Sequence, residues 1–331
     1  MNSMTIHVRR EFWEHRSLYI APLVWAAVIT LVAAWSIFVL IPNLAEHHGV
    51  MLSSPDKALS QLDDSDRQAA EAAIAEAKNH AGSVVQAKEA VFRFSFVAVT
   101  QMVTGLAIIV VFFYLLDCLY SERRDRSILF WKSLPISDAQ VVVAKLVVAL
   151  VVVPLGAILL AGVMELLLVA MFWLRFHDTV VGPVVSDWSL LTWVKSQGVA
   201  LVMGLGGVMW YAPIAGYLLL VSSWARRNVF LWAVLPPVAL GFLEWFFIHS
   251  TKVFEFIGWR FGGYVTKLRV DTDMMNVGTR DGGKDLRHVV DMLTNIDYSR
   301  LFLNSEVWIG MVAAAALVYA AIRMRRYRDE S

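Results

Sequence analysis

Residues 141–174 read VVVAKLVVALVVVPLGAILLAGVMELLLVAMFWL, an apolar run that two charged residues interrupt, Lys145 and Glu165. A helix needs about 20 apolar residues to cross the hydrocarbon core of a bilayer, which is about 30 Å thick. Lipid offers the backbone no hydrogen-bond partners, so a helix is the structure expected for such a run. Because the run is long and contains Pro154, we expect it to begin in the cytoplasm, or to tilt and kink.

Five further runs of the chain have the same apolar character. Together with Val141–Leu174, the predicted spans are Leu18–Ile41, Phe94–Leu116, Gly198–Ser222, Val229–Ile248 and Val307–Ile322. The adjacent Pro236 and Pro237 predict a broken helix in the fifth span, because proline removes a helical hydrogen bond and clashes with the preceding turn. The sequence thus predicts an all-α integral membrane protein, with six transmembrane helices in a single domain over residues 1–331.

Composition points to the same class of protein. Hydrophobic residues make up 58% of the 331 residues, charged residues make up 17%, and the mean hydropathy is +0.59. There is too little polar side chain to cover a water-facing surface, and the same figures exclude a disordered chain. A net charge of +1 gives no basic face for nucleic acid. The single cysteine, Cys118, excludes an internal disulfide and a cysteine-based metal site, and we expect this chain itself to bind no metal and no cofactor.

Lys and Arg are distributed unevenly between the two sets of loops. The set with the higher density comprises 1–18, 120–139, 223–228 and 323–331. The opposite set comprises 42–93, 175–196 and 250–305. The first set holds roughly thirteen Lys and Arg in about fifty residues, and the second roughly fifteen in about 130. Because cytoplasmic loops carry the excess of positive charge, we expect the first set, with both termini, to be cytoplasmic.

Residues 1–17 precede the first span and carry both apolar and charged side chains. The apolar side chains that can share one side of a helix are Val8, Phe12, Trp13 and Tyr19. The charged side chains on the other side are Arg9, Arg10, Glu14 and Arg16. This pattern predicts an amphipathic helix that lies among the lipid headgroups, with a frayed tail as the alternative. On the far side of the membrane we expect two external loops, 43–93 and 250–305.

The cytoplasmic loop between the second and third spans, residues 120–139, is unusually apolar. Its apolar residues are Ile128, Leu129, Phe130, Trp131 and Leu134, and they are flanked by Arg124, Arg126 and Lys132. A solvated loop has no need of such a cluster, whereas a docking surface combines aromatic anchors with a charged rim. Pro135 ends one short helix, and Ser137 or Asp138 can cap the next. The alternative is a loop whose aromatic side chains dip into the headgroups.

The run ERRDRSILFWKSLPIS, residues 122–137, resembles the first cytoplasmic loop of bacterial ABC-2 type transporter permeases. In that family a stretch rich in glutamate and arginine precedes a short coupling helix, a Pro-x-Ser turn and a lysine that enters the third span, here Lys145. The amphipathic N-terminal helix, the six spans and the cytoplasmic ends fit the same layout. The chain differs in having Ser127 and Ile128 where a glycine–threonine pair is frequent, and in its larger external loops.

The resemblance implies the permease subunit of an ATP-driven transporter, an exporter, in the bacterial inner membrane. Two permease copies, identical or related, would sit in the bilayer on two cytoplasmic ABC ATPase subunits. Those partners would bind ATP and Mg, and this chain would not itself be an enzyme. The coupling interface would comprise Arg124, Asp125, Arg126, Phe130, Trp131, Lys132, Leu134 and Pro135. Residues 278–284 have the spacing of a phosphate-binding loop, but Asp285 replaces the Ser or Thr that would hold magnesium, so we expect a turn.

Two carboxylates lie within predicted spans, Glu165 in the third and Glu244 in the fifth. An acidic side chain at the centre of a bilayer costs about 2.5–3.5 kcal/mol, so such residues face a bundle interior or a cavity. Both are candidates for the translocation pathway. The alternative is a hydrogen-bonded packing residue, and it is favoured for Glu244, which lies close to the outer boundary.

Two other classes of function are consistent with six spans. One is a membrane subunit that anchors or senses and does not transport. The other is an intramembrane enzyme, which would need His, Asp or Cys grouped at one membrane depth. The eight histidines lie in loops or at span edges, and this argues against the enzyme.

Overall fold

The computed structural model describes residues 3–43, 99–128, 137–177, 190–267 and 302–327. Every regular element in these residues is a helix, which confirms the predicted all-α class for the described part of the chain. In chain order the labelled helices are α1 (Ser3–Glu14), α2 (Ser17–Trp35), η1 (Ser36–Leu40), α6 (Tyr120–Arg124), α8 (Asp138–Val147), η2 (Val148–Val152), α9 (Val153–Phe176), α11 (Leu190–Trp224), α12 (Val229–Ile248), α13 (Lys252–Lys267) and α16 (Ser305–Tyr327). Residues 99–117 are helical as well.

Six continuous helical stretches among the described residues are long and apolar enough to cross a membrane. They are Ser17–Asn43, Val99–Arg124, Asp138–Phe176, Trp193–Trp224, Val229–Ile248 and Ser305–Tyr327. Each overlaps one predicted span. The prediction of six helices with the length and apolar character of membrane spans is therefore confirmed. The chain is a multi-pass membrane protein.

The third span is one helical stretch that changes its winding in the middle. Between α8 and α9, residues 148–152 form a π-helical turn, and the N–H of Val153 donates to the carbonyl of Val148. Pro154 follows directly, at the start of α9. Proline lacks the N–H for a helical bond and its ring crowds the carbonyl four residues earlier, here that of Leu150. The wider π turn accommodates this, so the expected irregularity at Pro154 is present.

The fifth span does not break where we expected. Helix α12 runs without interruption from Val229 to Ile248 and contains both Pro236 and Pro237, so the prediction of a broken helix was wrong. Proline at position 237 leaves the carbonyl of Ala233 without its helical donor. The hydroxyl of Tyr217 on α11 donates to that carbonyl at 2.8 Å. A side chain of the neighbouring helix α11 thus satisfies the Ala233 carbonyl. Proline is tolerated in membrane helices when a carbonyl that loses its helical donor finds another one.

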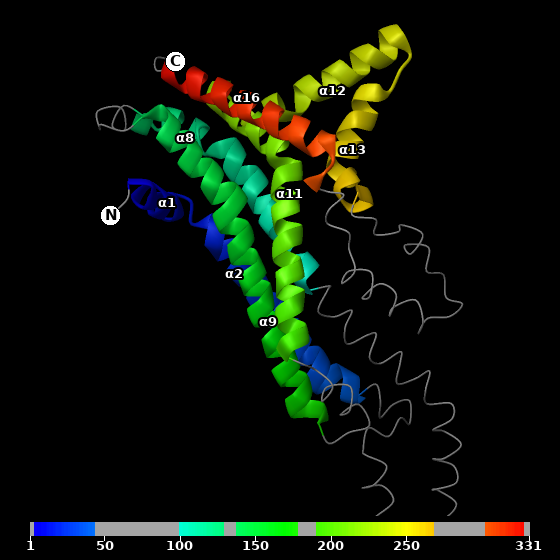
Figure 1. The fold of residues 1–331 in the computed structure, drawn as a ribbon. Helices are drawn as coiled ribbons and strands as arrows, with labels where there is room; N and C mark the ends of the chain where they lie inside the picture. The colour runs from blue at the N-terminus through cyan, green and yellow to red at the C-terminus, as the bar shows by residue number, and fades with distance from the viewer. Residues whose placement is uncertain (1–2, 44–98, 129–136, 178–189, 268–301, 328–331) are drawn as a thin grey trace, which may run out of the picture.

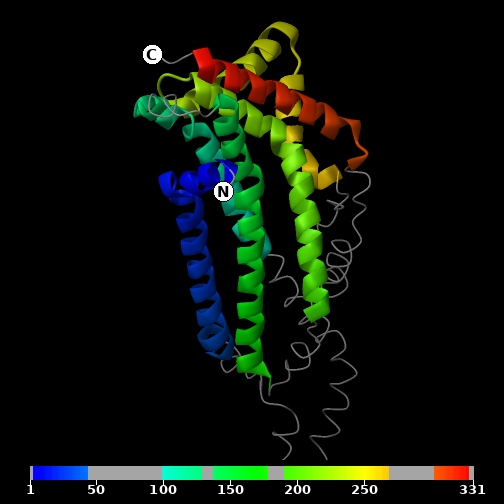
Figure 2. The ribbon, with the colours of Figure 1, turned by 60° about the vertical axis from the view of Figure 1, so that its left-hand side comes forward.

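Helices α2, α9 and the first part of α11 run side by side in both views (Figures 1 and 2). Helix α16 is steeply inclined to α9 and packs along the later part of α11. The two approach closely at Gly216, where a Cβ would lie 3.1 Å from the carbonyl oxygen of Ala314 and 3.2 Å from Cβ of Leu317. Small residues at helix contacts permit this approach, because packing drives association where lipid is as apolar as the side chains.

Helix α1 confirms that a helix precedes the first span, and it lies across the end of α2 (Figure 2). Phe12 packs against the core, whereas Trp13 is 68% exposed and does not share its side. Of residues 9–14, whose side chains are described, Glu11 is the buried one, at 2% exposed. The position of α1 among the lipid headgroups stays a prediction. The burial of Glu11 was not predicted, because its polar partners come from the rest of the bundle.

The predicted loop 250–305 contains a helix, α13, directly after α12. Helix α13 packs against both α12 and α11. The remainder of that loop from residue 268 to 301, and the loop 43–93, lie outside the described residues, as do Gly278–Lys284 with Asp285.

Candidate functional site

The fully buried side chain of Lys145, on α8, lies at the centre of an ion network. Its Nζ is 2.7 Å from Oε1 of Glu11 on α1 and 3.1 Å from Oε1 of Glu122 on α6. Removing an ammonium group from water costs several kcal/mol even after the protein relaxes. Two carboxylates within contact distance offset this cost, so the site holds Lys145 only while α1 and α6 stay packed against α8.

The network continues from Glu122 to the last span. Oε2 of Glu122 is 2.5 Å from Nη1 of Arg325 near the end of α16. Nε of Arg325 is in turn 3.0 Å from Oδ1 of Asp138, the first residue of α8. The side chains of Arg325 and Glu122 are each 3% exposed, so their pair is also shielded from water, whereas the side chain of Asp138 is 23% exposed. Anions and cations alternate through the site, and they join α1, α6, α8 and α16 at one end of the bundle.

A tyrosine and a further arginine complete the surroundings of the network. The hydroxyl of Tyr114, in the second span, donates to Oε2 of Glu11 at 2.8 Å. Nη2 of Arg10 lies 3.4 Å from Oε1 of Glu122, and Nε of Arg10 is 2.7 Å from Oε1 of Glu14. Every carboxylate oxygen of Glu11 and Glu122 therefore has a partner, as buried charges require.

The end of the fourth span is attached to the same place by a separate set of hydrogen bonds. Oγ of Ser222 on α11 accepts from the backbone N–H groups of Leu119 and Tyr120, both at 3.1 Å. Arg123 donates to the carbonyls of Ser222 at 2.7 Å and Ala225 at 2.9 Å. The last carbonyls of a helix have no partner within the helix, and here the Arg123 side chain satisfies two of them at the end of α11.

The network lies at both ends of the predicted coupling loop. Near the start of the loop, Arg124 and Asp125 are exposed and 3.1 Å apart, and Arg126 has a left-handed backbone with φ 55°. Near its end, Ser137 begins α8 with a capping box: its hydroxyl accepts from the N–H of Gln140, whose side chain accepts from the N–H of Ser137. Ser137 is thus the cap, of the two candidates we named.

The other predicted coupling residues lie outside the described part of the chain. They are Phe130, Trp131, Lys132, Leu134 and Pro135. Ile128, the last described residue before them, is 4% exposed. The described part of the loop before these residues therefore ends at a buried residue, and the described chain resumes at Ser137, one residue before Asp138 of the network.

The two candidate pathway carboxylates are placed differently. Glu165 is 5% exposed, and its oxygens accept from Thr100 Oγ1 at 2.5 Å, Gln197 Nε2 at 2.7 Å and Trp193 Nε1 at 3.0 Å. These donors come from the second and fourth spans, so Glu165 bonds three spans together. Glu244 accepts from the N–H of Val253 at 2.7 Å and so caps the first turn of α13.

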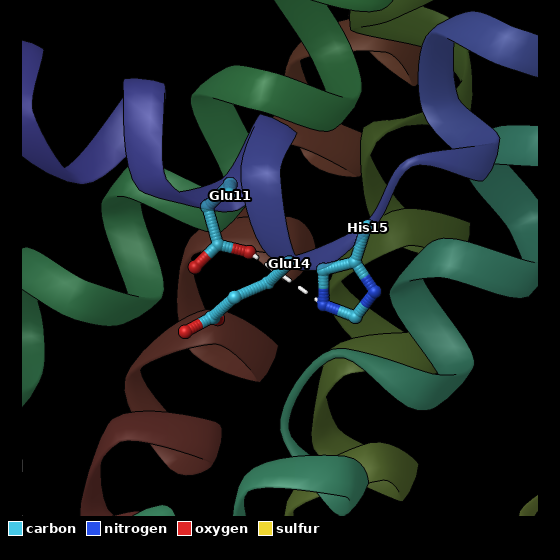
Figure 3. A group of neighbouring side chains, drawn as sticks. All are labelled: Glu11, Glu14 and His15. Carbon is cyan, nitrogen blue, oxygen red and sulfur yellow. Dashed lines mark ion pairs between the residues drawn. The ribbon is translucent and has the colours of Figure 1, made fainter.

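Glu11, Glu14 and His15 form the one group of potential metal ligands found among the described residues (Figure 3). The figure shows the Glu11 carboxylate directed towards the His15 ring, at 3.8 Å from Nε2. Glu11 is already paired with Lys145, and Glu14 with Arg10. Burial, and the positive charge of Lys145, lower the pKa of His15 below its ordinary value. With cations already on both carboxylates, we assign no metal here.

Compared with protein-family models, with curated proteins and with solved structures, the chain has no match. The evidence for a resemblance to ABC-2 type permeases is therefore the sequence of residues 122–137 itself.

Proposed function

We propose that this chain is the permease subunit of an ATP-driven transporter of the ABC-2 type, working as an exporter with a separate cytoplasmic ATPase. A second permease copy, identical or related, completes the transport unit in the bacterial inner membrane. The six apolar helices, the higher density of Lys and Arg in the loops at one set of helix ends, and the loop sequence 122–137 support this function. Both termini then lie in the cytoplasm.

The observation that carries the proposal is the ion network at the two ends of the coupling loop. Glu122 lies near the start of the loop, Asp138 lies near its end and Lys145 follows it; through Glu11 and Arg325 they reach α1 and α16. A force on the loop is therefore delivered to several helices at once. Buried ion pairs are costly to break, so these helix ends move as one body.

The mechanism that follows is a rigid-body switch. Closure of the ATPase on ATP displaces the loop, and the network passes the displacement to the spans, which exchange between two packed arrangements. In this proposal Phe130, Trp131 and Leu134 occupy a groove of the ATPase. Arg124, Asp125, Arg126 and Lys132 orient the loop in that groove, and Pro135 ends its short helix.

Co-purification of the ATPase with the chain tests the proposal. The Phe130→Ala and Trp131→Ala double variant should lose the ATPase in a pull-down, because the aromatic anchors of an interface carry most of its binding energy. Trp13→Ala is the matched control, since Trp13 is an exposed aromatic residue on α1. An ATPase that is recovered equally with all three proteins would contradict docking through this loop.

A second measurement separates transport from anchoring. In reconstituted complexes, hydrolysis of ATP should depend on the permease, and the double variant should abolish that dependence. Hydrolysis at one rate with and without the permease would favour a subunit that only anchors its partner.

A further inference from the structure

Arg260 of α13 is a buried cation between two spans. The residue is 7% exposed. Its guanidinium lies over the ring of Trp210 on α11, with 4.7 Å from Cζ to the ring centroid, and its carbonyl accepts from Trp210 Nε1 at 2.9 Å. On the side of α16, a Cβ at Gly310 would overlap with Arg260 Nη2. The absence of a side chain at Gly310 is therefore what gives the guanidinium its place.

The charge of Arg260 has no counter-ion in contact with it. Nη2 is shielded from solvent and donates no hydrogen bond, and no carboxylate of the described residues lies within 4.0 Å of the guanidinium. Glu306 on α16 attracts it only from farther away. Arginine stays protonated in proteins, so loss of a proton cannot relieve the cost of burial. Lys145, which is fully buried, has two carboxylates in contact.

Arg260 also lies between two membrane-spanning helices. Trp210 is near the middle of the stretch Trp193–Trp224, and Gly310 is near the beginning of the stretch Ser305–Tyr327. Two further bonds hold α13 there: the hydroxyl of Tyr264 donates to the carbonyl of Met203, and the hydroxyl of Tyr211 donates to the carbonyl of Phe261 at 2.9 Å. Ionisable residues packed among membrane-spanning helices are rare, and they mark sites for substrates and ions.

We propose that the guanidinium of Arg260 binds an oxyanion, the phosphate or carboxylate group of a ligand, at the junction of α11, α13 and α16. Arginine presents a planar set of donors that matches both groups. Trp210 covers one face of the guanidinium, so the oxyanion accepts hydrogen bonds at the edge of the guanidinium. The site needs no ATPase, and its test is therefore separate from that of the proposed transport function.

Thermal unfolding of the purified protein in dodecyl maltoside tests this binding. Phosphatidylglycerol supplies a lipid-borne phosphate, with phosphatidylcholine as the control for acyl chains. Potassium phosphate and potassium acetate supply soluble oxyanions, against potassium chloride at equal ionic strength. A ligand that binds the folded state raises the unfolding temperature in a saturable way. We compare Arg260→Gln with Arg226→Gln, which removes an exposed arginine.

The wild-type protein and Arg226→Gln should show the same saturable rise, and Arg260→Gln should weaken the apparent affinity about 10- to 100-fold. A response to phosphatidylglycerol alone assigns the oxyanion to a lipid, and a response to phosphate or acetate assigns it to a soluble ligand. Unchanged affinity in Arg260→Gln, or no saturable response of the wild-type protein to any of the three, overturns the proposal. Should Arg260→Gln not fold, Arg260→Lys replaces it. Lysine keeps the charge but loses the planar donors, so affinity equal to wild type would overturn the proposal too.

Discussion

Lys145 and Glu11 lie 134 positions apart in the sequence and form an ion pair with 2.7 Å between Nζ and Oε1, closed off from water. The pair fixes the helix that precedes the first span to the beginning of the third. Glu122 shares the same ammonium group, so the start of the coupling loop is part of the same contact. Stability and coupling are therefore expected to depend on the same few charges.

Replacing Lys145 by methionine should destabilise the protein by about 3–5 kcal/mol, because Glu11 loses the cation that lies 2.7 Å from it while it stays buried. Chemical unfolding in detergent measures the change. Lys195→Met is the control, since Lys195 is exposed. The additional change Glu11→Gln should recover part of the loss, and a double variant no more stable than Lys145→Met would argue against this explanation.

Arg325→Gln should separate docking from coupling. The ATPase should still co-purify, because the loop surface is intact, but permease-dependent ATP hydrolysis should fall as α16 loses its links to Glu122 and Asp138. Arg326→Gln, an exposed neighbour, should leave hydrolysis unchanged. Equal hydrolysis in the two variants would remove the network from the coupling path.

Glu165→Gln should cost about 1–3 kcal/mol of unfolding free energy, because an amide accepts less well than a carboxylate from Thr100, Trp193 and Gln197. If Glu165 also lines the pathway, export should fall in the folded variant. Glu244→Gln is the matched control, because that carboxylate caps α13. Unchanged export in Glu165→Gln would leave only the packing role.

Gly216→Leu should destabilise the contact between α11 and α16 by about 1–3 kcal/mol, the usual cost of overpacking. A Cβ at Gly216 already meets backbone at 3.1 Å, so a larger side chain forces the helices apart. Gly198→Leu should cause no such loss, because a Cβ there meets nothing within 4 Å. Thermal unfolding of both variants decides the matter.

Acidification should weaken the protein through His15. Its pKa is lowered in the folded state by burial and by Lys145, whereas the unfolded chain titrates near 6.5. The unfolded state therefore binds more protons in this window, and stability falls as the pH drops through 6.5 towards the lowered value. His15→Phe should flatten this slope between about pH 7.5 and about pH 5, the range in which a histidine titrates. An identical acid slope in both proteins would exclude His15 as the cause.

Much of the fold could be predicted because a span is a local property: twenty apolar residues in a row need no distant partner to be recognised. The buried face of α1 could not be predicted from the sequence. Glu11 is buried because it contacts Lys145 and Tyr114, which lie far along the chain. The uninterrupted α12 was missed for the same reason, because a hydroxyl from α11 satisfies the carbonyl of Ala233.

The candidate site was predicted in part. Lys145 was picked out by the resemblance, and a lysine inside an apolar run already implies a buried anion. Nothing in the sequence indicated which anions, because Glu11 carried no signal of its own and Glu122 was read only as part of the loop that resembles the family. Arg325, the cation that shares Glu122, was read as one of the charges after the last span. Arg260 was assigned to an external loop, and its contact with Trp210 depends on how α13 folds back along α11.

The π turn at residues 148–152 sets the phase between the two ionisable residues of the third span. Lys145 and Glu165 are 20 positions apart, and in a regular α-helix they would point about 200° away from each other. The extra residue taken up by the π turn subtracts about 100° from that difference. Rewinding these residues as a regular α-helix without removing one would thus rotate one half of the span by about 100° against the other, and Lys145 and Glu165 could no longer both face inward.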